Sequence, residues 1–472
     1  MSNLPLTAPR ALVFLGLRAV AAVLLVALLA PPCVDAFFRP FHAWYWAQDP
    51  QWAPSTLWLP AYTWVYGAVV KLVGETVWTP GLLSATFFLG TLARLFRALP
   101  PNHRATALLW VGLTPLSWVV AGTGLSEAFF GFCLVFGVTE LAGYGADDRR
   151  GALPWAALAI LVAACTRYDA WPLLPIFSVF ALRAARARGA GPLGVAWALL
   201  PLCVPLGWMA LSYTRRGDPL WFMTSVANDH FGATDPMVFL TGPGVFSLGL
   251  AAVGLLVGLS RARRSPDLGV YVAMVTMTGL FVGWLFASGN LPSQLPERMV
   301  YPALLLSAPL VGAAWAPWAP HRQLALAAGL LVASAAYLVG LPDAVPPAER
   351  QLARLIDEAY AGGQLQADQH VLISGSYPEI TAVLVTANHG GRVHLEGVGR
   401  TCPNQVLTCD SPCGAPAWRD AVSLVLVGAG TGQRAMAGRG WTPVTRVGTY
   451  QVLFRQGAAP PLCPRDTGSA AP

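Results

Sequence analysis

Residues 11–30 read ALVFLGLRAVAAVLLVALLA, an apolar run as long as a membrane-spanning helix requires. A bilayer core of about 30 Å is crossed by roughly 20 apolar residues. The run follows Arg10, as a secretion signal would, but it is longer than the apolar core of such signals and other apolar runs follow it. We therefore interpret it as a retained membrane anchor. Arg18, inside the run, is expected to extend toward the same surface as Arg10.

The composition of the whole chain is typical of a membrane protein. Of 472 residues, 55% are hydrophobic and 11% are charged, whereas roughly a quarter of an ordinary soluble domain is charged. This excludes a soluble cytosolic enzyme. The basic excess lies in residues 1–340, which hold 20 Arg or Lys and 13 Asp or Glu, while residues 341–472 hold 10 of each. All basic residues except Lys71 are arginine, a usage typical of a GC-rich bacterial genome.

Ten further apolar runs follow the first, so we predict eleven transmembrane helices. The runs cover residues 11–30, 78–98, 105–121, 125–144, 153–166, 170–184, 193–213, 244–260, 268–288, 303–318 and 323–341. If the N-terminus is cytoplasmic, thirteen arginines fall on the inner side, while the outer connections hold six basic and nine acidic residues. This is the bias of the positive-inside rule, and it predicts a cytoplasmic N-terminus.

Residues 59–74 are apolar enough for a twelfth span, but counting them would invert every later span. The segment and its flank carry Trp58, Tyr62, Trp64 and Tyr66. Tryptophan and tyrosine prefer the depth of the lipid headgroups. We therefore expect an interfacial helix in the first outer loop.

An odd number of spans places residues 342–472 outside the cytoplasm. Apolar runs of strand length occur there at residues 371–374, 422–427 and 450–454, and residues 348–360 favour a helix. The predicted fold is an all-α polytopic membrane protein of about eleven transmembrane helices, residues 1–341, with a small C-terminal α/β extracytoplasmic domain, residues 342–472. The expected location is the bacterial inner (plasma) membrane.

Four of the eight cysteines lie in the C-terminal part. They are Cys402, Cys409, Cys413 and Cys463. An even number of cysteines in an oxidising compartment suggests disulfides, and four allow three pairings. A zinc site at the first three is the alternative, but their spacing lacks a CxxC pair and no histidine lies among them.

Several function classes lose their main support from the absence of their motifs. The sequence contains no Walker A motif, no HExxH and no GxSxG. ATP-driven transport, zinc hydrolysis and serine hydrolysis therefore have no sequence signature here. We expect no nucleic-acid partner.

Polar residues gather at the outer ends of the predicted spans. The five clusters lie at residues 35–46, 124–127, 166–169, 217–222 and 296–302. Each begins or ends an apolar run, so we expect them to converge at one depth. Because ionisable groups near a membrane are costly and usually serve a task, we predict an outward-facing cavity at the bilayer surface.

Five short motifs on this outer side carry a family resemblance. They are Asp35 just after the first span, Trp58-Leu-Pro60-Ala-Tyr62, Thr166-Arg167-Tyr168, Gly217-Asp218-Pro219-Leu220, and Arg298 followed by Tyr301-Pro302. In this order the chain resembles the integral-membrane glycosyltransferases of the GT-C superfamily, such as protein mannosyltransferases and aminoarabinose transferases. The resemblance covers the layout of residues 1–340, and a soluble outer tail also fits many bacterial members.

The resemblance implies an inverting transfer of a sugar, mannose or another hexose or pentose, from a polyprenyl-phosphate donor. The acceptor would be a protein, a lipid or a glycan at the outer face of the bilayer. Asp35 matches the family's acidic residue in the first loop, which implies a general base for the acceptor hydroxyl. Glu127 is the second implied catalytic residue, holding the acceptor or the hydroxyls of the donor sugar.

A lipid phosphate is the leaving group of this reaction, so cations must stabilise its developing charge. The residues implied at the donor phosphate are Arg298, Arg167, Lys71 and Tyr301. Guanidinium groups suit phosphate because they bind it through two parallel hydrogen bonds. His42 and Tyr45 are expected to shape the acceptor entrance.

The first loop departs from the metal-dependent branches of the superfamily. Those branches usually show a paired acid, whereas Val34-Asp35-Ala36-Phe37 offers one carboxylate. We therefore expect no cofactor and no metal, with arginines in the place of a divalent ion, although a divalent metal stays open as the alternative.

Each site residue also has a purely structural interpretation. Asp35 could cap a helix, Arg298 could pair with Glu297, and Arg167 could pair with Asp169. For the remaining candidates these interpretations are a turn acid at Glu127, aromatic packing at His42 and Tyr45, and nonspecific lipid contact at Lys71.

The competing function is a polytopic transporter or a lipid flippase that performs no glycosyl transfer. Transporters usually place polar residues at mid-membrane on broken helices and show a repeat between their halves. In this sequence the ionisable residues cluster toward one face, and no repeat is apparent. The pattern therefore favours the enzyme.

Overall fold

The computed structural model describes most of the helical part of the chain and the strands of its C-terminal part. The described residues are 8–28, 39–40, 42–43, 46–47, 50, 52, 59–73, 79–146, 151–223, 249–256, 259, 268–288, 296–315, 320–339, 347–374, 392–395, 422–427, 441–448 and 450–455. Internal contacts divide the chain into two units. The helical unit comprises Met1–Pro32, Pro50–Tyr66 and Pro80–Pro342, and the C-terminal unit comprises Cys33–Asp49, Gly67–Thr79 and Asp343–Pro472.

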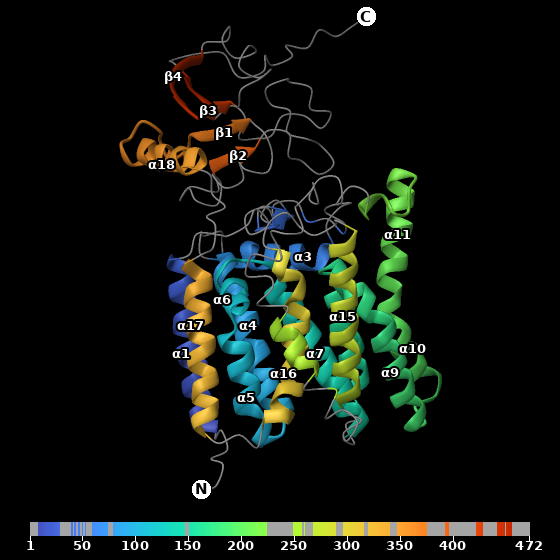
Figure 1. The fold of residues 1–472 in the computed structure, drawn as a ribbon. Coiled ribbons are helices and arrows are strands. Elements are labelled where there is room, and N and C mark those ends of the chain that lie inside the picture. The colour runs from blue at the N-terminus through green and yellow to red at the C-terminus, as the bar shows by residue number, and fades with distance from the viewer. Residues whose placement is uncertain are drawn as a thin grey trace, which may run out of the picture. The chain divides into compact units, whose positions relative to one another are not determined.

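The helical unit is a bundle of α-helices (Figure 1), and short turns join the consecutive helices from α4 to α11. Its α-helices are α1 (Ala8–Leu28), α4 (Thr79–Ala98), α5 (Pro101–Leu113), α6 (Pro115–Gly122), α7 (Ser126–Ala146), α8 (Ala152–Ala164), α9 (Leu174–Ala187), α10 (Gly191–Leu199), α11 (Cys203–Arg216), α15 (Gly269–Ala287), α16 (Tyr301–Trp315) and α17 (Pro320–Val339). The 3₁₀ turns are η1 (Tyr168–Leu173), η2 (Leu200–Leu202) and η4 (Pro296–Val300). Helix α3 (Pro60–Val73) is shared between the two units.

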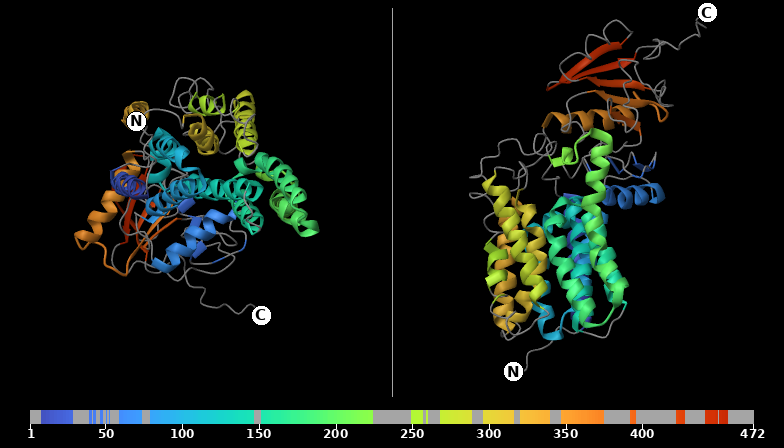
Figure 2. Two further views of the ribbon diagram at one scale, coloured as in Figure 1. Left: turned by 90° about the horizontal axis from the view of Figure 1, so that it is seen from below. Right: turned by 90° about the vertical axis from the view of Figure 1, so that its right-hand side faces the viewer.

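The inner helices of the bundle are α5, α7 and α16. Helix α16 packs against both α5 and α7, and α7 packs against α8. Helix α17 packs against α5 and α6, and α1 packs against α6, as the view along the bundle in Figure 2 lets the reader follow. Gly131 of α7 permits the close approach of α16, because a Cβ atom there would lie 2.5 Å from Leu305 Cδ1 and 2.9 Å from Tyr301 Cε1.

Among the described residues, five helical segments are long and apolar enough to cross a membrane. They are Ser126–Gly145, Gly191–Arg216, Gly269–Ala287, Glu297–Trp315 and His321–Val339. The pair α5 and α6 would add a sixth as a broken span, and shorter apolar helices occur at Val13–Leu24 and Ala152–Ala164. Several apolar helices are thus present, while the count of eleven spans stays a prediction.

The prediction of one continuous span over residues 105–121 is wrong, because the segment bends by 66° between α5 and α6. Pro115 lacks an N–H group, so α5 ends before it and leaves its last carbonyl groups without helical partners. Side chains supply the missing donors. Ser334 Oγ donates to the Leu113 carbonyl at 2.6 Å, and the Thr114 hydroxyl donates to the Trp110 carbonyl.

The expectation that Arg18 extends to the membrane surface is also wrong. Its side chain is 2% exposed, and its Nε–H donates to the Gly112 carbonyl at 2.7 Å. The guanidinium lies over the Trp118 ring, with Cζ 3.5 Å from the ring centroid. The break in the helix explains this position, because a freed carbonyl group inside the bundle needs a donor that lipid cannot supply.

The C-terminal unit contains one sheet and helix α18 (Pro347–Ala361). Its strands are β1 (His370–Ser374), β2 (Val393–Leu395), β3 (Val422–Val427), β4 (Trp441–Val447) and β5 (Tyr450–Arg455), in the order β2-β1-β3-β5-β4. Strand β1 is parallel to β2 and β3, and β5 is antiparallel to β3 and β4. The predicted strands at 371–374, 422–427 and 450–454 and the helix at 348–360 are confirmed, while β2 and β4 were not expected.

Burial explains which strands could be predicted from the sequence. In β1, Val371, Leu372 and Ile373 are fully buried, as a central parallel strand requires. Strand β4 lies at the sheet edge and contains Pro443, which cannot donate to a ladder. Its sequence therefore lacks the apolar run that marks a central strand.

Candidate functional site

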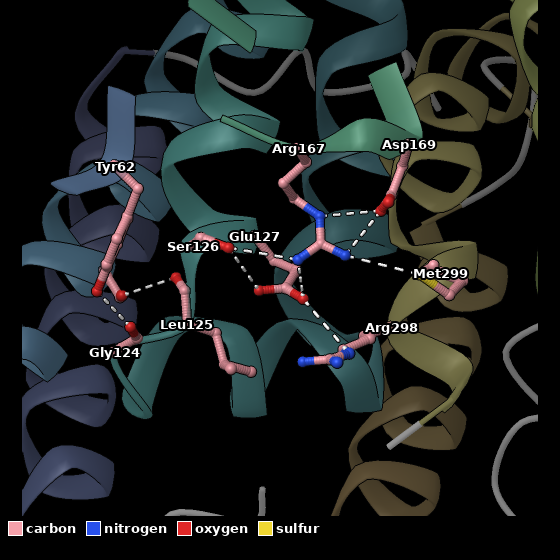
Figure 3. A network of polar contacts seen from close by, with 10 residues as sticks. Tyr62, Gly124, Leu125, Ser126, Glu127, Arg167, Asp169, Arg298 and Met299 are labelled. Atoms are coloured by element: carbon pink, nitrogen blue, oxygen red, sulfur yellow. Dashed lines mark hydrogen bonds and ion pairs between the residues drawn. The ribbon is translucent and has the colours of Figure 1, made fainter. Parts of the chain in front are cut away.

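Four charged side chains meet inside the helical unit, and we call Glu127, Arg167, Asp169 and Arg298 the ionic cluster. Glu127 lies in the first turn of α7, and Arg167 lies between α8 and η1. Asp169 belongs to η1 and Arg298 to η4. Three of the five polar clusters predicted from the sequence therefore come together in space (Figure 3).

Arg167 is the centre of the ionic cluster. Its Nε–H donates to Asp169 Oδ2 at 2.9 Å, and its Nη1 donates to Glu127 Oε1 at 2.5 Å and to Ser126 Oγ at 3.3 Å. Its Nη2 lies 2.8 Å from Asp169 Oδ2 and 3.6 Å from the Met299 sulfur. A guanidinium has five N–H donors. In this arrangement Arg167 directs them at protein acceptors, so it organises the two carboxylates around it.

Glu127 links the two arginines. Its side chain is 1% exposed, and Oε1 lies 2.5 Å from Arg167 Nη1 and 3.8 Å from Arg298 Nε. Figure 3 shows the Arg298 guanidinium on the other side of this carboxylate from Arg167. With two acids and two arginines, the formal charges of the cluster balance. That balance makes the three buried charges of Glu127, Arg167 and Asp169 tolerable beside the partly buried Arg298, because an unpaired buried charge would cost several kcal/mol.

The turn before α7 is fixed by two hydrogen bonds from other helices. Tyr62 Oη donates to the Gly124 carbonyl at 2.6 Å, and Ser84 Oγ donates to the Leu125 carbonyl at 3.2 Å. Gly124 has φ +73°, and a Cβ atom there would lie 2.5 Å from Pro80 Cβ. Only glycine meets both conditions without strain. The turn therefore presents Glu127 at a defined place.

Four aromatic side chains pack together beside the segment that carries Arg167 and Asp169. They are Tyr168, Trp171, Trp208 and Phe222. The rings of Tyr168 and Phe222 stack with centroids 5.0 Å apart, and Trp171 meets both edge-on. Trp208 Nε1 donates to Tyr168 Oη at 3.0 Å. These contacts hold η1 against α11, and they fix the backbone that carries Arg167 and Asp169.

The other predicted site residues take different positions. Tyr301 is fully buried at the start of α16, and among the described residues its hydroxyl has no hydrogen-bond partner. Lys71 is exposed on α3 and His42 is half-buried, and both belong to the C-terminal unit. Asp35 and Tyr45 lie outside the described residues, as do Cys402, Cys409, Cys413 and Cys463.

Tyr337 and Met299 are site neighbours that sequence reasoning missed. Tyr337 Oη donates to Glu297 Oε1 at 2.7 Å, next to Arg298 in the chain. A signal for Tyr337 existed, because its hydroxyl lies in an otherwise apolar run and needs a partner there. Met299 gave no such signal, since methionine is an ordinary core residue.

The described residues contain no group of three or more His, Cys, Asp and Glu side chains placed to hold a metal ion. Chemically, the ionic cluster combines buried guanidinium groups with carboxylates at the end of several helices. Guanidinium groups bind phosphates and other anions, and a carboxylate accepts hydrogen bonds from hydroxyl groups.

The fold matches solved structures of ArnT from Cupriavidus metallidurans. The apo structure matches with a TM-score of 0.59 at 15% sequence identity, over 94% of this chain and 97% of that chain. This chain shares the fold of ArnT. The structure of ArnT bound to undecaprenyl phosphate matches with a TM-score of 0.58 at the same identity and coverage. An oligosaccharyltransferase from Archaeoglobus fulgidus in the apo form has a TM-score of 0.46 at 11% identity, over 95% of this chain and 75% of that chain.

No family model matches the sequence, and no curated protein matches it either. The fold match with ArnT agrees with the resemblance that the five short motifs predicted. ArnT is an aminoarabinose transferase, one of the two examples that the motifs suggested. At 15% identity the match concerns the arrangement of elements, and the chemistry has to be argued from the residues of this chain.

Proposed function

We propose that this protein is a membrane glycosyltransferase that moves a sugar from a polyprenyl-phosphate donor to an acceptor at the outer face of the bacterial inner membrane. The observation that carries the proposal is the ionic cluster, which lies on a fold shared with ArnT over 94% of the chain. A buried cluster of charges within an apolar bundle is costly and favours a function over a role in stability.

The bond changes of the proposed reaction are simple. Asp35 takes the proton of the acceptor hydroxyl while that oxygen attacks the anomeric carbon of the donor sugar. The bond between this carbon and the phosphate oxygen breaks, and the lipid phosphate leaves with the electron pair. One displacement inverts the configuration. A positioned base and a stabilised leaving group each lower the barrier.

In this proposal the two arginines have different tasks. Arg298 binds the donor phosphate, because its side chain is 11% exposed whereas that of Arg167 is 5% exposed and surrounded by acceptors. Arg167 holds Glu127 and Asp169 in place. Glu127 accepts a hydrogen bond from a hydroxyl of the donor sugar or the acceptor when a substrate displaces part of the cluster.

The remaining candidates keep, in this proposal, the roles that the family resemblance implies. Lys71 adds a second cation for the lipid phosphate, and His42 and Tyr45 shape the acceptor entrance. Tyr301 supports Arg298 from the next turn of the chain and reaches the phosphate only after α16 or η4 shifts, because its side chain is fully buried. The positive charge comes from arginines, so the proposal requires no metal, and activity that survives EDTA is the expected result.

The test uses the purified full-length protein in detergent with a panel of polyprenyl-phosphate sugars that differ in the sugar. Release of the lipid phosphate in the presence of candidate protein, lipid and glycan acceptors measures the reaction. At least one donor should be cleaved, and Asp35→Asn should abolish release while the protein remains folded and membrane-inserted. Wild-type release in Asp35→Asn would overturn the assignment of the base.

The same preparation separates the enzyme from a flippase. Reconstituted into vesicles, a flippase moves the labelled lipid between leaflets with the sugar still attached. Movement without any cleavage of any donor, under conditions in which the protein binds the lipid, would replace the glycosyltransferase by that alternative.

A further inference from the structure

Three consecutive residues of η4 contact three different parts of the helical unit. Glu297 accepts a hydrogen bond from Tyr337 of α17 at 2.7 Å, and Arg298 Nε lies 3.8 Å from Glu127 Oε1 of α7. Met299 Sδ accepts from Arg167 Nη2 at 3.6 Å. A 3₁₀ helix has three residues per turn, so successive side chains point about 120° apart. The rotation of this one turn therefore decides where Arg298 points.

The contact with α17 anchors this turn to a helix that contributes no residue to the ionic cluster. Glu297 is 3% exposed and Tyr337 is 7% exposed, so their hydrogen bond is shielded from solvent. Tyr337 continues the buried stripe of α17 that includes Leu330 and Ser334, at spacings of four and three residues. The stripe packs against the bundle, and its last member reaches η4.

We propose that Tyr337 and Glu297 form a positioning pair that sets the rotation of η4 and thereby directs Arg298 toward the donor phosphate. This inference rests on the proposed function, since it assigns the pair to the same site. Neither residue touches the substrate in this proposal. Tyr337 acts through Glu297 and η4, and α17 thereby becomes part of the machinery that binds the donor.

The pair explains why a carboxylate is buried at residue 297. A buried carboxylate without a donor would cost several kcal/mol. If residue 297 served only to hold η4 against α17, an apolar side chain would suffice and would avoid the cost of burying a charge. The tyrosine hydroxyl gives the turn one preferred orientation instead, because a hydrogen bond weakens steeply as its angle departs from linear.

The test compares three variants of the full-length protein in detergent. Tyr337→Phe removes the hydroxyl alone, and Glu297→Gln keeps the acceptor oxygen while it removes the charge. Ser334→Ala is the matched control, because it removes another buried hydroxyl of α17, one that bonds the Leu113 carbonyl at 2.6 Å instead of η4. The readouts are the affinity for undecaprenyl phosphate, the unfolding temperature, and KM and kcat for any donor that the protein cleaves.

Loss of this hydrogen bond should weaken the affinity for undecaprenyl phosphate by about three- to tenfold in Tyr337→Phe, and raise KM for the donor more than it lowers kcat. Glu297→Gln should stay within about twofold of the wild type, because Tyr337 still has an acceptor. Ser334→Ala should bind undecaprenyl phosphate with the affinity of the wild type, even if its unfolding temperature falls as much as that of Tyr337→Phe. In an Arg298→Ala background, Tyr337→Phe should cause no further loss of affinity.

Wild-type affinity in Tyr337→Phe, or an equal additional loss in the Arg298→Ala background, would overturn the positioning role. The proposed function fails differently. If the protein binds undecaprenyl phosphate and Tyr337→Phe weakens this binding as expected, but no donor is cleaved, the positioning role of the pair is supported. The proposed glycosyltransferase function is then overturned. If Arg298→Ala leaves lipid-phosphate binding unchanged, both the phosphate role and the pair are overturned.

Discussion

At the residue scale, burial separates two arginines that the sequence treats alike. Arg167 and Arg298 both lie within polar motifs next to apolar runs. In the structure Arg167 donates hydrogen bonds to Glu127, Asp169, Ser126 and the Met299 sulfur. Arg298 is in contact with the same cluster through its Nε, which lies 3.8 Å from Glu127 Oε1. The guanidinium group of Arg167 therefore holds Glu127 and Asp169 in place. In our proposal, the guanidinium group of Arg298 binds the donor phosphate.

The substitution Arg298→Ala tests recognition. A hydrogen bond to a charged group contributes about 1.5–3 kcal/mol, so the affinity for the lipid-phosphate donor should fall about tenfold to a hundredfold. Affinity for the acceptor should change little, because the guanidinium does not contact it in the proposed reaction. Titrations of donor and acceptor against the same preparation measure both. Equal losses for the two substrates would contradict the assignment.

The substitution Arg167→Met tests organisation. It leaves Glu127 and Asp169 buried without their shared partner, which should lower the free energy of unfolding by about 3–5 kcal/mol. Thermal unfolding in detergent measures the loss, and the triple variant that adds Glu127→Gln and Asp169→Asn should recover part of it. A triple variant no more stable than Arg167→Met would show that the ion pairs are not the source of the cost.

At the element scale, the prediction from sequence was good for uniform helices and poor where a helix breaks. Helices α7, α15 and α17 coincide with predicted apolar runs, since their residues share one environment from end to end. The break between α5 and α6 follows from Pro115, a residue visible in the sequence. What could not be foreseen is that Arg18 and Ser334 would supply the missing donors, because they lie on helices remote along the chain.

This break makes a prediction for Arg18. Arg18→Met keeps the length of the side chain but leaves the Gly112 carbonyl without its donor, which should cost about 1–3 kcal/mol of stability. Arg183→Met on α9 is the matched control, because Arg183 is exposed and its loss should stay within about 0.5 kcal/mol. Unfolding curves of the two variants in detergent give the comparison. A cost for Arg18→Met no larger than that of the control would mean that the donor is dispensable.

The C-terminal unit predicts a pH dependence at the start of β1. The pKa of His370 lies below its usual value of 6.5 because the half-buried imidazole loses hydration and lies near Arg392, while Asp368 offsets this in part. A lowered pKa means that the unfolded chain takes up the proton first. The local free energy of unfolding should therefore fall as the pH drops from 6.5 through the lowered pKa, and stay constant above that range.

Hydrogen exchange of residues 370–374, corrected for the intrinsic effect of pH, measures this dependence on the full-length protein. Arg392→Gln should make the loss of protection on acidification smaller, and Asp368→Asn should make it larger, because the two side chains act on His370 in opposite directions. Identical pH profiles in both variants and the wild type would show that His370 does not govern the stability of this strand.

At the scale of the whole molecule, the orientation in the membrane is the prediction with the widest consequence. The distribution of arginines predicts a cytoplasmic N-terminus and a C-terminal unit outside the cytoplasm. Only on that side would the unit meet an extracytoplasmic acceptor. The structure contributes several apolar helices and a separate C-terminal unit, while the side of the membrane rests on charge alone.

The substitution Gly430→Cys tests the orientation. An impermeant thiol reagent should label this cysteine in intact cells whose outer envelope has been made permeable, and Arg263→Cys in a predicted inner connection should stay protected until the inner membrane is opened. Labelling with the reverse pattern would invert the topology and move the proposed reaction to the cytoplasmic face.

Composition and the spacing of apolar runs were enough to predict a membrane protein, the polar ends of its helices, and an α/β part after them. Those properties depend on local composition, which a single chain displays. The three-dimensional arrangement was needed to see that Glu127, Arg167, Asp169 and Arg298 form one cluster, that Arg18 is buried at a helix break, and that Tyr337 reaches Glu297. These are contacts between residues far apart in the chain, and packing of whole helices sets them.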